Sequence, residues 1–251
     1  MKYFFANWKM YLDLEESCAV ARSLVGLSFD ERNIGVAVFP TLLALAAVRD
    51  ILRDSAVAVG AQNVSWAPKG AYTGAVSSVL LQAVGCRYAL VGHSERRHIF
   101  GETSDEVRKK LAAVLDAGLV PVLCIGETQA DRDADKTTYR LKKQLMKALD
   151  GLALGDADLL VAYEPVWAIG TGVPCGAAEA EAIHGWIKQE VKSYLGREVP
   201  VLYGGSVTSS NVAEYAARSL IDGVLVGSAS TKIAAWSEFI ANMSRASGAA
   251  L

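Results

Sequence analysis

Three side chains able to take part in acid–base chemistry each follow an apolar run: Lys9 after "YFFANW", His93 after "YALVG" and Glu164 after "DLLVAY". Together they suit proton abstraction from a carbon next to a carbonyl. Glu164 would take the proton, while His93 and Lys9 would stabilise the oxyanion that forms. Each residue alone also has a structural interpretation: a solvated lysine, a hydrogen-bonded structural histidine, and a carboxylate favoured at a helix N-terminus. The chemistry therefore depends on a fold that brings the three together.

The run "SERRHIF" directly after His93 is typical of a short helix. The imidazole would then lie at a helix N-terminus, where the partial positive charge of the backbone disfavours a protonated ring. We therefore expect His93 to be neutral.

The elements that must position these residues alternate along the chain. Eight short apolar runs recur: "YFFANW", "IGVAVF", "VAVGA", "YALVG", "VPVLCIG", "DLLVAY", "VPVLYGG" and "DGVLVG". Nearly continuous hydrophobicity is typical of strands buried on both faces, as in a parallel sheet covered by helices. Amphipathic segments separate the runs, with helix starts indicated by Asp13, which has Glu16 three residues on, and by Ser104.

This alternation predicts an α/β fold, a single closed (β/α)8 barrel over residues 1–251, with an open doubly wound sheet as the alternative. No Pro/Ser-rich linker or charge block divides the series. The carboxyl ends of barrel strands meet at one mouth, so Lys9, His93 and Glu164 would converge there. The small residues of the tail "SRASGAAL" predict a frayed or lightly docked end.

Composition excludes several classes of protein. Hydrophobic residues make up 52% and charged residues 21%, which favours a sizeable core over disorder. A net charge of −2 disfavours nucleic acid or an anionic membrane as a partner. The sequence shows no secretory leader, no long apolar run and no C-x-x-C pair, so we expect a cytoplasmic protein with reduced thiols. Its cysteines are Cys18, Cys86, Cys124 and Cys175.

Three glycine-bearing stretches, "AIGTG", "YGGSV" and "LVGSAS", follow the last three runs. Their backbone amides, the Ser206 hydroxyl and a helix N-terminus near Ser228 would form an anion site, which barrels commonly place after strands 7 and 8. The alternative is that these glycines only turn the chain into helices.

Other signatures are incomplete. "GTGVPC" has Cys175 where a dinucleotide fingerprint needs its third glycine, and "GHSER" has Arg96 where a hydrolase elbow needs glycine, which disfavours Ser94 as a nucleophile. No "GK" dipeptide or H-E-x-x-H motif occurs. We therefore expect neither a metal nor a cofactor. A non-catalytic barrel that binds phosphorylated metabolites stays the alternative.

Seven motifs together resemble the triosephosphate isomerase family: "NWKM", "VGHSERR", "GETSDEV", "PVLCIGET", "AYEPVWAIGTG", "YGGSV" and "LVGSAS", in order from Asn7 to about Ser230. The resemblance implies a cofactor-free isomerase that interconverts dihydroxyacetone phosphate and glyceraldehyde 3-phosphate through an enediolate, with Glu164 as base and His93 as electrophile. By the same resemblance Asn7 and Lys9 contact substrate. The implied phosphate site is Gly170, Ser206, Gly227 and Ser228, and the implied supporting residues are Ser94, Glu95, Cys124, Glu127, Trp167 and Tyr203.

The resemblance also implies that residues 165–176 form a lid that excludes water, because an enediol phosphate in solvent would lose its phosphate. Glu127, through Trp167, and Tyr203 would hold alternative positions of this lid. The chain departs from the common pattern at Val173, Pro174 and Cys175, where the fixed φ of proline predicts altered lid kinetics.

The family resemblance further implies a homodimer through residues 62–74, from Gln62 to Gly74. Two departures lie where the family forms this interface, Tyr11 and Ala75. The loss of a carboxylate at Ala75 removes one expected partner of Arg96, which predicts a weakened dimer. Ser228 stands where many family members have glycine, and its backbone N–H stays usable if its φ is negative.

Overall fold

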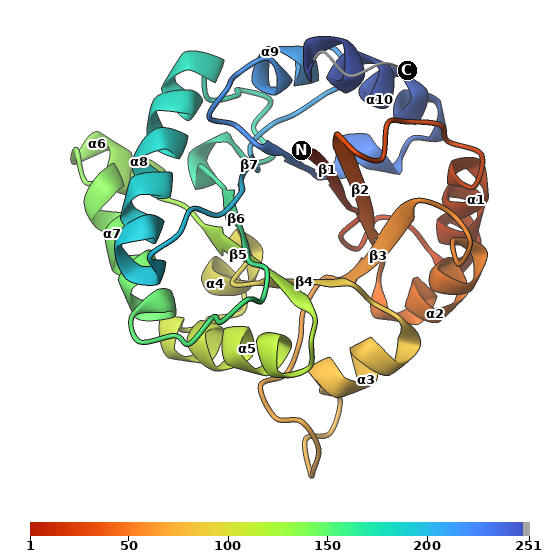
Figure 1. The fold of residues 1–251 in the computed structure, drawn as a ribbon, viewed down its shortest axis with the longest axis horizontal. Coiled ribbons are helices and arrows are strands. Elements are labelled where there is room, and N and C mark those ends of the chain that lie inside the picture. Colours follow the sequence, from red (N-terminus) through yellow and green to blue (C-terminus); the bar gives the residue numbers. More distant parts are fainter. Residues whose placement is uncertain (248–251) are drawn as a thin grey trace.

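The computed structural model describes residues 1–247, in which eight parallel strands close into a barrel surrounded by ten helices (Figure 1). Because β8 pairs with β1, the prediction of a closed barrel is confirmed and the open sheet is wrong. The strands are β1 (Lys2–Asn7), β2 (Ile34–Phe39), β3 (Val57–Ala61), β4 (Tyr88–Val91), β5 (Val120–Ile125), β6 (Leu160–Tyr163), β7 (Val201–Tyr203) and β8 (Gly223–Val226). The helices are α1 (Leu14–Leu24), α2 (Leu42–Ile51), α3 (Ser78–Val84), α4 (Ser94–His98), α5 (Ser104–Asp116), α6 (Gln129–Asp133), α7 (Thr137–Leu149), α8 (Ala177–Leu195), α9 (Val212–Ala216) and α10 (Ile233–Ser247), with short 3₁₀ helices η1 (Val166–Ala168) and η2 (Ser228–Thr231).

The core has two layers because neighbouring residues of a strand point to opposite faces. Phe5 points into the barrel, where its ring centroid lies 4.7 Å from that of Tyr88. Phe4 points outward and lies 5.1 Å from Trp236 and 5.0 Å from Phe239 of α10. Both phenylalanines are fully buried. Burial on both faces explains why the strand sequences are apolar throughout instead of alternating.

The cap predicted from the sequence is confirmed at α1 and is wrong at α5. The Asp13 carboxylate accepts the Glu16 N–H at 2.8 Å, and the Glu16 carboxylate accepts the Asp13 N–H at 2.9 Å, which confirms the predicted start of α1. At α5 the capping box is formed by Thr103 and Glu106. The prediction of Ser104 as the cap is therefore wrong by one residue, because threonine and serine are both good caps and only the backbone turn selects between them.

Helix α10 includes the first part of the tail for which we expected a frayed end. Residues 244–247 are helical and Ser244 is fully buried, so the expectation of a frayed end, one of the two alternatives, is wrong for these residues. Residues 248–251 lie outside the described residues.

Closure of the barrel requires close backbone contact between its first and last strands. Gly223 of β8 pairs with Tyr3 of β1 and has a φ of +156°. A Cβ atom at Gly223 would lie 2.1 Å from the carbonyl oxygen of Tyr3, which no side chain can tolerate without moving the backbone. This position therefore admits only glycine.

We expect Gly223→Ala to lower the free energy of unfolding by about 3 kcal/mol, since the added methyl group forces the two strands apart. Urea unfolding followed by circular dichroism at fixed protein concentration would measure the change. Gly26→Ala is the matched control, because a Cβ atom there meets no atom within 4 Å. Equal unfolding midpoints for the two variants would contradict the prediction.

Candidate active site

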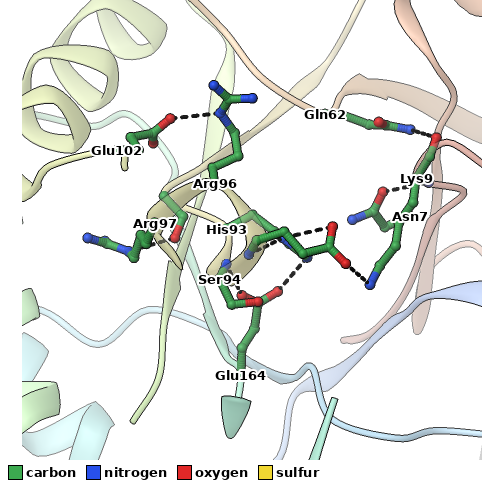
Figure 2. Close-up of polar contacts among 11 residues, drawn as sticks. Asn7, Lys9, Gln62, His93, Ser94, Arg96, Arg97, Glu102 and Glu164 are labelled. Carbon is green, nitrogen blue, oxygen red and sulfur yellow. Dashed lines mark hydrogen bonds and ion pairs between the residues drawn. The ribbon is translucent and has the colours of Figure 1, made fainter. Parts of the chain in front are cut away.

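The barrel brings Lys9, His93 and Glu164 together at the carboxyl ends of β1, β4 and β6. Figure 2 shows His93 beside Glu164, with Asn7 and Lys9 on the other side of the site, at the end of β1. The three residues line one cavity of about 290 Å³. The same cavity is lined by the other expected substrate and phosphate residues, Asn7, Gly170, Ser206, Gly227 and Ser228, and also by Tyr11.

Glu164 is a buried carboxylate, with only 1% of its surface exposed. Its Oε1 atom lies 3.0 Å from His93 Nε2, and its Oε2 atom accepts the Ser94 backbone N–H at 2.8 Å. Burial raises the pKa of Glu164, but His93 and the Ser94 hydrogen bond outweigh it, so the pKa lies below its ordinary value. Glu164 is therefore ionised at neutral pH.

The backbone of Glu164 is fixed by close contact with the end of β5. The Glu164 N–H donates to the carbonyl of Ile125 at 2.7 Å. A Cβ atom at Gly126 would lie 1.7 Å from the Glu164 carbonyl oxygen, so only glycine fits there. The Gln144 side chain accepts the Gly126 N–H at 2.9 Å and donates to the Gly126 carbonyl at 3.0 Å. No sequence pattern singles out Gln144, which lies in the middle of α7.

His93 caps α4 with its side chain, because its Nδ1 atom accepts the Glu95 backbone N–H at 3.3 Å. This bond assigns the hydrogen of a neutral ring to Nε2, which faces Glu164. Burial lowers the pKa of His93, but the Glu164 carboxylate outweighs it and raises the pKa above its ordinary value. The sequence could not show this carboxylate at 3.0 Å, but a neutral ring stays our expectation, because a charged imidazole could not accept the Glu95 N–H at Nδ1.

Lys9 adopts a left-handed backbone conformation with a φ of +51°. Its Nζ atom pairs with Glu95 Oε1 at 2.5 Å. Its N–H donates to the Asn7 side chain at 3.0 Å, and its carbonyl accepts from Gln62 at 2.7 Å (Figure 2). Gln62 directly follows β3, so the rule that singled out polar residues at strand ends would also have found it.

Two hydrogen bonds join the lid to Glu127 and Tyr203, the residues that the resemblance singled out. Trp167 Nε1 donates to Glu127 Oε1 at 2.7 Å, and the Cys175 N–H donates to the Tyr203 hydroxyl at 3.0 Å. Because both bonds exist in one lid position, the expectation that they hold alternative positions is wrong for this structure. Glu127 also accepts from the Tyr163 hydroxyl at 3.0 Å, a partner that the sequence analysis missed.

The glycine-bearing loops form the other end of the cavity. The Ser206 hydroxyl donates to the lid carbonyl of Ala168 at 2.6 Å. Gly170, at the lid tip, has a φ of +71°, a left-handed conformation that glycine adopts without strain. Ser228 begins η2, and it is absent from the described residues that have positive φ, so its backbone N–H stays usable.

Comparison with known proteins identifies the family. A family model described as "Triosephosphate isomerase" matches residues 2–243. The chain belongs to the triosephosphate isomerase family. Relatives named triosephosphate isomerase include one from Moorella thermoacetica, 45% identical over 231 residues, which are 89% of this chain and 91% of that one. Another, from Dehalococcoides mccartyi, is 41% identical over 230 residues, 90% of each chain, and one from Roseiflexus sp. is 43% identical over 231 residues, 90% of this chain and 91% of that one. The chain is therefore an enzyme of this family.

In this triosephosphate isomerase family member, Cys124 lies fully buried inside the barrel near the site. Burial and the Glu164 carboxylate raise the pKa of its thiol, so it stays neutral. Its backbone carbonyl accepts from the Arg97 guanidinium at 3.3 Å, and Arg97 also donates to the Gly92 carbonyl at 2.7 Å. Arg97 thus links the end of β5 to the segment that carries His93.

Within the described part of the chain, no group of three or more His, Cys, Asp or Glu side chains is arranged to hold a metal ion. In the same residues, no helix has both the length and the apolar character that crossing a bilayer requires.

We expect Glu164→Gln to lower the pKa of His93. The carboxylate raises this pKa by stabilising the charged ring, so its removal leaves the lowering effect of burial unopposed. An NMR titration of the imidazole would measure the change, with the exposed His98 as an internal reference. A His93 pKa that is equal or higher in the variant would contradict the prediction.

Proposed function

We propose that this chain, as one domain over residues 1–251, interconverts dihydroxyacetone phosphate and glyceraldehyde 3-phosphate through an enediolate. The observation that carries the proposal is the buried, ionised Glu164 carboxylate, 3.0 Å from His93 in the cavity that Lys9 also lines. A carboxylate base next to an imidazole and an ammonium group is the set of groups that enolisation of a carbonyl compound needs. Family membership supports the same reaction.

The proton is carried by Glu164. Both of its oxygens are engaged by His93 and by the Ser94 N–H, so the carboxylate has to turn away from these donors to reach a carbon-bound proton. When the Glu164 carboxylate rotates away, the His93 Nε2–H is free to donate to the substrate carbonyl oxygen. The contact that raises the His93 pKa is lost in the same step, so the ring acts as a neutral donor.

The charge of Lys9 stabilises the developing oxyanion. Its ammonium group is held by Glu95, which leaves two of its three hydrogens for the substrate. The substrate phosphate would lie at the other end of the cavity, against the backbone of Gly170, Gly227 and Ser228 and beside Ser206. Lid closure over this end excludes water and protects the enediolate from loss of phosphate.

The alternative function is binding of phosphorylated metabolites without catalysis. We expect Glu164→Gln to lower kcat about a thousand-fold, because the amide keeps the size of the side chain but cannot accept the proton. A coupled assay with glyceraldehyde 3-phosphate would measure kcat, and calorimetry with dihydroxyacetone phosphate would check that binding survives. Glu198→Gln on an exposed side chain is the matched control and should keep full activity. Equal and negligible turnover by wild type and E164Q would favour the binding function.

We also propose a homodimer through residues 62–74. Figure 1 shows the loop between β3 and α3 projecting beyond the ring of helices. A cavity of about 360 Å³ lies at its base and is lined by Trp66, Tyr72 and Ala75. Near this cavity the start of α2 carries Leu43, which is 89% exposed. A projecting loop and an apolar hollow on one surface suit a two-fold interface, in which each copy supplies both parts.

Arg96, whose expected partner at position 75 is missing, is paired within its own chain. Its Nε atom donates to Glu102 Oε2 at 2.8 Å, and the same carboxylate contacts Lys110. Arg96 therefore keeps a carboxylate partner without position 75, although it shares that carboxylate with Lys110, which supports a dimer that is weakened and not abolished by Ala75.

We expect the wild-type protein to sediment as a dimer at micromolar concentration, and Tyr72→Glu to shift it toward the monomer. The added charge would have to be buried in the interface without a partner. Tyr139→Glu on α7 is the control, because Tyr139 is also an exposed tyrosine but lies away from the loop. A wild-type monomer would overturn the homodimer, and a dimeric Tyr72→Glu would overturn this interface.

A further inference from the structure

Two stacked tyrosines hold the residue at which the lid joins α8. The N–H of Cys175 donates to the Tyr203 hydroxyl at 3.0 Å, and the Cys175 carbonyl accepts from the Tyr215 hydroxyl at 2.7 Å. The two rings lie parallel, with centroids 4.2 Å apart and an interplanar angle of 13°. The backbone of a single lid residue is therefore bound at both of its polar groups by one aromatic pair.

The position of this pair connects the lid to the rest of the site. Tyr215 lies on α9, is 1% exposed and has no contact with the catalytic cavity. Tyr203 ends β7, and a Cβ atom at Gly205 would lie 2.2 Å from its hydroxyl. Gly205 itself lines the cavity beside Ser206. The pair thus lies between the end of the lid and the loop at which phosphate would bind.

The Tyr215 hydroxyl has a role other than packing, because it donates a hydrogen bond to the Cys175 carbonyl. A phenylalanine ring would stack on Tyr203 equally well, so packing alone does not require the hydroxyl. Cys175 is fully buried, and without the hydroxyl its carbonyl would lose a buried hydrogen bond. Pro174, directly before Cys175, has no N–H and cannot supply a replacement contact. Tyr215 is therefore the group that fixes the carbonyl side of this lid residue.

We propose that Tyr215 is a positioning residue for the lid, and this inference rests on the isomerase function proposed above. By holding the Cys175 carbonyl, Tyr215 keeps the Cys175 N–H aligned with Tyr203 and so keeps the tip at Gly170 and Gly172 over the phosphate end of the cavity. Loss of the hydroxyl leaves the barrel and the catalytic groups in place but shortens the time for which the lid covers the enediolate.

The time for which the enediolate is uncovered can be measured through a side reaction that releases phosphate. In an exposed enediolate the oxyanion becomes an aldehyde carbonyl, and the former C=C electron pair forms a double bond to the third carbon. The C–O bond to phosphate breaks, and inorganic phosphate leaves with that bonding pair. The remaining enol takes a proton from water on its terminal carbon and returns its O–H proton to water, which makes it a 2-oxoaldehyde. Phosphate released per isomerisation therefore reports how well the lid is held.

The test compares wild type, Tyr215→Phe and Tyr194→Phe. Tyr194 on α8 is the matched control, because its hydroxyl donates to Glu190 at 2.9 Å, away from the lid. For Tyr215→Phe we expect kcat/KM to fall about five-fold, and phosphate released per isomerisation to rise by a similar factor, as loss of one ordinary hydrogen bond implies. Tyr194→Phe should stay within about two-fold of wild type in both measurements.

A second measurement does not need turnover. Hydrogen exchange of the lid amides, in the presence of inorganic phosphate, should be faster in Tyr215→Phe than in wild type or in Tyr194→Phe. Unchanged phosphate release and unchanged exchange in Tyr215→Phe would overturn the inference, even if its melting temperature falls. A wild-type protein without isomerase activity would instead overturn the proposed function, while the exchange result would still show whether Tyr215 holds the lid.

Discussion

The central constraint of this molecule is a charged carboxylate placed where water does not reach it. An ionised group in such a position is tolerated only when donors surround it. Glu164 meets this condition through two contacts from one segment, the ring of His93 and the N–H of Ser94. These donors keep the carboxylate charged, and they also reduce its basicity until it turns toward substrate. The other residues of the site are positioned around this charged carboxylate.

The sheet achieves the positioning by geometry alone. Parallel strands end at one mouth, so residues separated by more than half of the chain become neighbours without any local sequence signal between them. Close backbone contact completes the arrangement, because Gly126 lets β5 touch the backbone of Glu164. Gln144 then fixes Gly126 from α7. The position of the Glu164 carboxylate therefore depends on backbone contact at Gly126 and on the side-chain amide of Gln144.

Much of the fold and of the candidate site could be predicted from the sequence. Burial on both faces makes the strands apolar throughout, and the rule that barrels carry function at strand ends was enough to select Lys9, His93 and Glu164. The contributions of Gln144 and Tyr215 could not be predicted, because both lie inside helices and act on residues that are distant in sequence. The raised pKa of His93 was missed for the same reason, since it depends on a contact across the barrel. The single-residue error at Thr103 came from a different source, the similar capping ability of threonine and serine.

The backbone of Lys9 carries an implication for how this chain can change over evolutionary time. Of the described residues, only Lys9 and Asp135 have a positive φ without being glycine. Such a conformation costs a lysine of order 1 kcal/mol that glycine would not incur. Mutational drift governed by folding alone would therefore favour replacing this lysine with glycine. The lysine is therefore accounted for by its ammonium group, which pairs with Glu95 and lines the cavity, and not by the stability of its backbone.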